Sequence, residues 1–93
     1  MEKYISIPNT DSSKPNVLIS VSNIFSIRKN NNTAVNIQYE NKAAQNQIWH
    51  DSDQGYEMVE WLIANVLNAN NHKSMITEVS DPPFDITGFY LGT

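Results

Sequence analysis

Apolar residues recur at helical spacing in one clear stretch of this sequence, between Ser52 and Asn70. The pattern i, i+3, i+4, i+7 places side chains on one side of an α-helix. An amphipathic helix is therefore predicted from about 52 to 70, and its apolar side needs a surface to cover it. The side chains on that side are Met58, Val59, Leu62, Ile63 and Val66.

Polar residues mark the two ends of the predicted helix. Asp51 or Ser52 is the expected N-cap, and Gln54 lies three residues after Asp51, as in a capping box. Asp51 and Asp53 also lie where the positive end of a helix dipole favours carboxylates. Asn70 begins the asparagine pair that ends the pattern.

The other segments are short, and their patterns are typical of β-strands. In the clearest of them Val35, Ile37 and Tyr39 alternate with polar residues, which indicates a half-buried antiparallel strand. Clusters of turn-forming residues, including Asn30 to Asn32, separate the segments. The predicted extended segments are Lys3–Ile7, Val17–Ser20, Ile24–Lys29, Thr33–Glu40, Ala44–Trp49, Ser74–Val79 and Ile86–Leu91.

Together these elements predict an α+β fold, in which a mainly antiparallel sheet of about five strands packs on the one helix. The 93 residues are expected to form a single small domain, 1–93, because they cannot build two independent cores. The predicted core consists of Ile5, Ile24, Ile27, Val35, Ile37, Tyr39, Ile48, Val59, Leu62, Ile63, Val66 and Phe89.

The closing segment, Ile86–Leu91, is apolar on both faces. Such a strand is either inserted between other strands of its own sheet or covered by something else. At a sheet edge it would promote aggregation unless another subunit covered it. Both alternatives remain open from the sequence, and the second makes a homo-oligomer a reasonable expectation.

The composition disfavours several classes of function and location. The formal net charge is −4, from 10 acidic and 6 basic residues, which disfavours a nucleic-acid partner. The sequence has no cysteine for a thiolate nucleophile or a disulfide. It also has no apolar run near the ~18 residues of a membrane span, and its first residues lack the apolar region of a signal peptide. We therefore expect a protein that is neither secreted nor transmembrane.

One cluster offers candidate chemistry. His50, Asp51 and Asp53 place an imidazole and two carboxylates at the start of the helix, which is compatible with a metal site or an acid–base pair. Helix capping explains the same aspartates more simply. No nucleophile motif or phosphate-binding glycine loop is present. We thus expect no catalytic residue, no cofactor and no enzyme activity.

Aromatic residues suggest contact surfaces instead. Trp49, Tyr56 and Trp61 flank the helix start and could form an aromatic patch, since Trp and Tyr are enriched at interface hot spots. Partial burial within the monomer is the alternative for Trp61. The candidate interface residues are Trp49, Tyr56, Trp61, Ile86, Phe89, Tyr90 and Leu91.

The order of segments resembles a group of short, uncharacterised proteins of marine tailed phages, of the T4-like cyanophage type. The resemblance rests on the first strand ending at Pro8, on Val21 to Ile24, on the strand at 35–39, and above all on Thr77 to Pro83 followed by Ile86 to Phe89. Glu40 to Lys42 differ from the group, in which a glycine often makes that turn. The resemblance implies a phage origin and a compact α+β fold, without an activity. A looser similarity, over 24–67, is to small β-rich flagellar domains.

Three functions are compatible with these features. The favoured one is a non-enzymatic phage protein that acts through protein–protein contacts, associates with itself, and is part of the virion or of its assembly. The second is a host-directed binding protein made in the host cytoplasm during infection. The third and least favoured is a metal-binding or enzymatic domain centred on His50.

Overall fold

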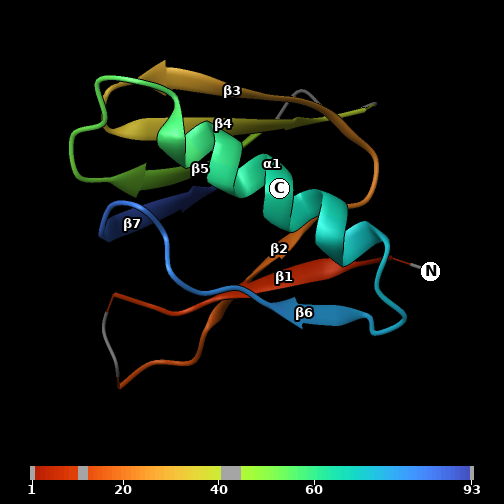
Figure 1. The fold of residues 1–93 in the computed structure, drawn as a ribbon. Coiled ribbons are helices and arrows are strands. Elements are labelled where there is room, and N and C mark those ends of the chain that lie inside the picture. Colours follow the sequence, from red (N-terminus) through yellow and green to blue (C-terminus); the bar gives the residue numbers. More distant parts are fainter. Residues whose placement is uncertain (1, 11–12, 41–44, 93) are drawn as a thin grey trace.

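The computed structural model describes residues 2–10, 13–40 and 45–92. This part of the chain folds into one α-helix and seven β-strands, mostly antiparallel, with the helix packed against two sheets (Figure 1). The predicted α+β class is confirmed. The seven strands divide into two sheets, whereas the sequence suggests one sheet of about five.

Sheet A contains β1 (Tyr4–Ile7), β2 (Val17–Ser20) and β6 (Ile76–Glu78) in the order β2-β1-β6. The pair β1–β2 is antiparallel, and β1–β6 is parallel. The division into two sheets follows from this pairing, because β6 returns to β1, near the start of the chain, and not to the strand before the helix. Period-two alternation reports which face of a strand is buried, but it carries no information about which strand is its neighbour.

Sheet B contains the antiparallel strands β3 (Ile24–Asn31), β4 (Ala34–Tyr39), β5 (Gln45–His50) and β7 (Ile86–Leu91) in the order β3-β4-β5-β7. The first three are consecutive in the chain and form a meander, and each coincides with one of the predicted extended segments. Asn23, which separates two of the predicted extended segments, has a φ of 60°. The predicted turn at Asn30–Asn32 moves to the end of that run, because β3 continues to Asn31. The turn at Glu40–Lys42 lies partly outside the described residues.

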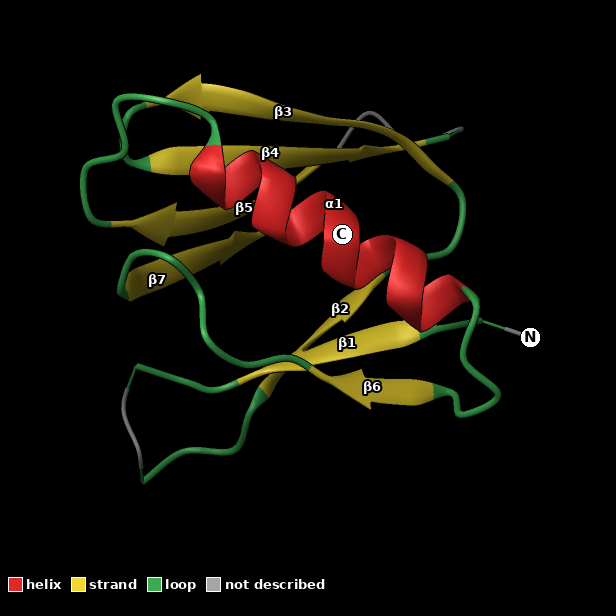
Figure 2. Cartoon of the chain, viewed as in Figure 1, coloured by secondary structure: helices red, strands yellow, loops and turns green. Residues whose placement is uncertain are grey.

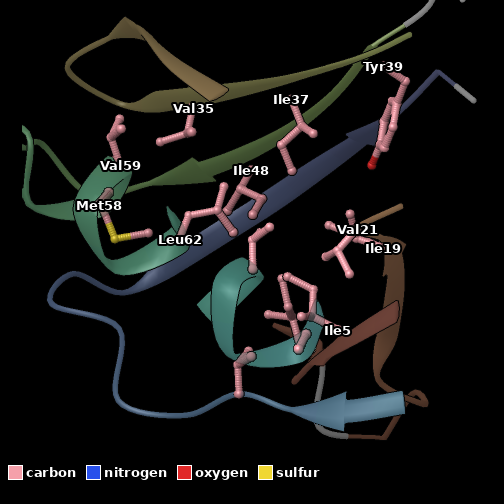
Figure 3. Packing of buried hydrophobic residues seen from close by; sticks show 14 residues of the cluster. Ile5, Ile19, Val21, Val35, Ile37, Tyr39, Ile48, Met58, Val59 and Leu62 are labelled. Atoms are coloured by element: carbon pink, nitrogen blue, oxygen red, sulfur yellow. The ribbon is translucent and has the colours of Figure 1, made fainter. Parts of the chain in front are cut away.

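The helix α1 (Glu57–Asn70) lies diagonally across both sheets and covers one face of each (Figure 2). Side chains from sheet B, such as Val35, Ile37 and Ile48, meet Ile5 and others from sheet A beneath it (Figure 3). These residues are at most 1% exposed. One continuous hydrophobic core therefore joins the two sheets through the helix.

Most of the predicted core is confirmed. Ile63 is wrong, because it is 39% exposed, whereas Ala69 is fully buried, so the inward stripe of the helix runs through 58, 59, 62, 66 and 69. Ile24, Ile27 and Phe89 are only partly buried, at the margin of the cluster. The buried hydrophobic residues that are missing from the predicted core are Ile7, Ile19, Val21, Ala34, Met58, Ala69 and Val79.

The predicted start of the helix is also wrong. The helix begins at Glu57, and its N-cap residue, Tyr56, makes no side-chain capping bond. Asp53, three residues earlier, provides the acceptor: its Oδ2 accepts the Met58 backbone N–H at 3.0 Å and its Oδ1 accepts the Gly55 N–H at 2.9 Å. A carboxylate near the helix dipole is thus present as expected, but neither Asp51 nor Ser52 is the N-cap.

Strand β7 lies at an edge of sheet B, beside β5. Among the described residues, no strand pairs with its other edge. The alternative in which this strand inserts between two strands of its own sheet is therefore wrong. Phe89 and Ile86 pack against the core, whereas Tyr90 and Leu91 are 52% and 51% exposed.

The Tyr39 side chain connects the two sheets. Its hydroxyl donates a 2.6 Å hydrogen bond to the Ser20 carbonyl of β2 and accepts one of 3.1 Å from the Asn46 amide of β5. Tyr39 is 6% exposed. A buried polar group is stabilising only when it is hydrogen-bonded, so this pair of bonds fixes the distance between β2 and sheet B.

Candidate functional site

The structure distributes the candidate interface residues over separate places. Trp49 and Tyr90 project from the face of sheet B that is opposite the helix, because their strand neighbours Ile48 and Phe89 point into the core. Trp61 lies on the helix and Tyr56 just before it. The predicted aromatic patch of Trp49, Tyr56 and Trp61 is therefore not formed.

Tyr56 packs on β3 instead. The Lys29 ammonium lies 5.2 Å from the centre of the Tyr56 ring and donates a 2.7 Å hydrogen bond to the Gly55 carbonyl. A cation over an aromatic face is attractive, so Lys29 holds the segment that leads into the helix. Tyr56 is nevertheless 64% exposed.

A groove of about 420 Å³ brings together two of the candidates, Trp61 and Ile86. It lies where the helix start, the end of β1 and the segment before β7 meet. We call it the Trp61 groove; its apolar lining consists of Ile7, Pro8, Trp61, Val79, Pro82 and Ile86.

The rim of the Trp61 groove is acidic. Asp81 and Asp85 both line it, and no Lys or Arg does so among the described residues. Asp81 has a φ of 57°, an unusual conformation for a residue other than glycine. The Trp61 indole N–H donates to the Ser80 carbonyl at 3.2 Å, which fixes the ring against the groove wall.

The prolines and aspartates of the groove were missed from the sequence. Pro8 and Pro82 are recognisable there only as strand breakers, and their distance along the chain hides their proximity. Because β1 and β6 pair in parallel, the ends of these two strands lie side by side, and the prolines that follow them come close together. One signal in the sequence could have revealed the groove. Pro8 directly follows β1, and Pro82 lies a few residues after β6, so both prolines follow strands that pair in sheet A.

A second surface, the outer face of sheet B, is formed by the side chains that alternate with the core residues. Register places Arg28 and Gln47 on either side of Asn36, and Gln47 beside Tyr90. Trp49 lies opposite Gly88. The side chains on this face include Arg28, Asn36, Gln38, Gln45, Gln47, Trp49 and Tyr90, together with the smaller Ser26 and Ala34.

A smaller hollow of about 260 Å³ lies where the two sheets meet, and polar groups line it. Tyr4 donates a 2.6 Å hydrogen bond to Glu2, and Tyr39 is bonded to Ser20 and Asn46. These groups satisfy one another, so the hollow is explained by the junction of the sheets.

The candidate metal cluster is used for structure. Both carboxylate oxygens of Asp53 accept hydrogen bonds from backbone N–H groups, and Asp51 is exposed. His50 is 2% exposed, and its Nδ1 lies 2.7 Å from the Asp51 carbonyl oxygen. Across residues 2–10, 13–40 and 45–92, no three His, Cys, Asp or Glu side chains are grouped to hold a metal ion. This geometry favours helix capping over metal binding for Asp53.

Asp53 should make stability sensitive to acid. The hydrogen bond from Met58 lowers the pKa of its carboxyl, helped by Gly55, Lys29 and His50 and opposed by burial. Because the folded-state pKa is lowered, the stabilisation is complete above the unfolded-state value of about 3.9 and is lost as the pH falls through the folded-state value. We expect Asp53→Asn to flatten the fall of melting temperature below pH 4, measured by circular dichroism. Asp51→Asn, at an exposed neighbouring site, is the matched control, and an equal flattening in both would contradict this assignment.

Comparison with known proteins found no matching family model, no similar curated protein and no similar solved structure. The described residues also contain no helix that is long and apolar enough to cross a membrane.

Proposed function

We propose that this chain is a non-enzymatic protein that acts through protein–protein contacts and associates with itself. The observation that carries the proposal is the Trp61 groove, an apolar channel with a fixed indole on its wall. Tryptophan is enriched at interface hot spots, which lie in well-packed pockets. The groove is built from positions that are far apart in the sequence, so it forms only in the folded chain.

The position of β7 supports self-association. An edge strand with exposed apolar side chains tends to acquire a neighbour from another chain, and Leu91 is about half exposed on this strand. The start of β7, at Ile86, forms part of the Trp61 groove. A second copy can therefore cover the strand and fill the groove in a single contact.

The biological setting in this proposal is a tailed phage, with the protein in the virion or in its assembly. It is supported by the resemblance of the sequence to short phage proteins. The edge of sheet B at β7, which has no partner strand among the described residues, is also consistent with a protein that forms an oligomer within a particle. A host-directed binding protein is the alternative if no self-association is found.

The first experiment is a measurement of molar mass by light scattering behind a sizing column, at two protein concentrations. We expect a dimer or larger species that Trp61→Ala converts to a monomer, because the variant removes the groove wall. Leu67→Ala, on the exposed side of the same helix, should leave the mass unchanged. A native monomer at both concentrations would contradict self-association, and a host-lysate pull-down with native protein against Trp61→Ala would then test the alternative.

A further inference from the structure

The outer face of sheet B differs chemically from the rest of this chain. The larger side chains that register places on it include two aromatic rings, four amides and one guanidinium, with no carboxylate among them, although the chain has 10 acidic residues and a net charge of −4. One positive charge is too little to hold a phosphate backbone, and without a carboxylate the face has no counter-charge for a cation. The face therefore suits a neutral ligand that forms hydrogen bonds.

Two glycines make room for the two rings. A Cβ on Gly88 would lie 2.9 Å from Trp49 Cε3, and one on Gly92 would lie 3.0 Å from Tyr90 Cε2 and 2.6 Å from the Gln45 carbonyl oxygen. No glycine in the described residues has a positive φ. Glycine is thus required at these positions by the space that the neighbouring groups occupy, and not by backbone conformation.

The Trp49 ring is held on two sides. One edge of it occupies the space above Gly88, and its indole N–H donates a 2.9 Å hydrogen bond to Gln47 Oε1. Trp49 remains 41% exposed. A ring that is already fixed in place loses little conformational freedom when a ligand stacks on it, which favours binding.

The amides form a row beside the rings. Asn36 is 5% exposed and lies between Arg28 and Gln47, and its Oδ1 has no hydrogen-bond partner among the described residues. Because Asn36 is itself covered by its neighbours, the amides that a ligand can reach are those of Gln38, Gln45 and Gln47. An amide both donates and accepts hydrogen bonds, as does a hydroxyl group, so a row of amides matches a ligand rich in hydroxyls.

We propose that the outer face of sheet B binds a neutral carbohydrate. The apolar C–H face of a pyranose ring stacks on Trp49, the next sugar contacts Tyr90, and the hydroxyls bond to the partly exposed amides of Gln38 and Gln47. Trp49 and Tyr90 are diagonal neighbours on adjacent strands, roughly 7–8 Å apart, which allows one oligosaccharide to contact both. An apolar protein surface would instead bury these amides without partners, at a cost in free energy. This site is separate from the Trp61 groove and goes beyond the proposed protein contacts.

The test is native gel electrophoresis through gels that contain one soluble polysaccharide each: a β-glucan, an α-glucan and a mannan as neutral probes, and an alginate as an anionic probe. Single-stranded DNA is tested separately by mobility shift. We expect retardation by at least one neutral polysaccharide. Trp49→Ala and Tyr90→Ala should each weaken it about tenfold or more, as for a hot-spot residue. Circular dichroism shows whether each variant is folded.

Two further variants sharpen the test. Gly88→Val removes no polar group but displaces the Trp49 ring, so it should weaken retardation. Trp61→Ala, at the other tryptophan of the chain, should leave retardation unchanged even if it abolishes self-association, which separates this proposal from the preceding one. The carbohydrate proposal is overturned if no neutral polysaccharide retards the protein, if only alginate or DNA binds, or if folded Trp49→Ala binds as the native protein does.

Discussion

Replacing Leu62 by alanine should lower the free energy of unfolding by about 3 kcal/mol, as for other large-to-small changes in a packed core. Leu62 is 1% exposed at the middle of the helix and lies among side chains from the core that joins the two sheets. The cavity left by the change would lie at the point where this core is continuous, so we expect a single unfolding transition that is shifted as a whole.

Leu67→Ala is the matched control, because the same change is made five residues later, on a side chain that is 59% exposed. Its effect should stay within about 0.5 kcal/mol. Urea unfolding followed by circular dichroism and by tryptophan fluorescence measures both variants. Similar losses for the two would mean that the helix does not face the sheets as described, and two separate transitions would mean that the sheets unfold independently.

Replacing Tyr39 by phenylalanine should cost about 2 kcal/mol, because it removes one buried and one partly buried hydrogen bond while keeping the ring. Those bonds link β4 to β2 and β5. Tyr90→Phe, which makes the same change on a half-exposed tyrosine of another strand of the same sheet, should cost little. Thermal unfolding at neutral pH measures the difference, and equal stability of the two variants would contradict a structural role for the Tyr39 hydroxyl.

The same tyrosine predicts a sensitivity to alkali. Burial raises the pKa of Tyr39, the Asn46 hydrogen bond opposes this rise, and Glu2 adds to it. Because the folded-state pKa is raised, the neutral hydroxyl contributes fully below the unfolded-state value of about 10, and the contribution is lost as the pH rises through the folded-state value. Stability should therefore fall more steeply above pH 10 in the native chain than in Tyr39→Phe.

The sequence predicted local features well because short-range chemistry determines them. The alternation of Val35, Ile37 and Tyr39 identified an antiparallel strand, and the apolar period identified the helix. The prediction that this strand is half-buried was wrong, because Ala34 and Asn36 on its other face are also buried. The start of the helix was wrong for a reason that a sequence pattern does not contain: Asp53 acts from outside the helix, and its own N–H is bonded to the Asn32 carbonyl of a distant turn. Tertiary contacts thus moved the first turn to Glu57.

The candidate sites depend even more than the helix start on tertiary contacts that a sequence pattern does not contain. Aromatic composition identified Trp49, Trp61 and Tyr90 as residues of interest, but they were grouped by their positions along the chain. Their true neighbours come from strand register, which places Trp49 over Gly88, and from the β1–β6 pairing, which places Pro8 near Trp61. No local pattern encodes either relationship, so the groove and the outer face emerge only from the folded chain.

The way in which the chain alternates between the sheets also determines the order in which it can fold during synthesis. Strands β3, β4 and β5 are consecutive, so their meander can close with short loops as soon as it leaves the ribosome. Strand β1, among the first to emerge, must wait for β6, and β5 must wait for β7. A nascent chain that ends before residue 76 thus carries two unprotected strand edges at once, which is when a folding chain is most prone to aggregate. In this protein, β6 and then β7 complete sheet A and sheet B in turn, so both edges are covered only after residue 91 has been made.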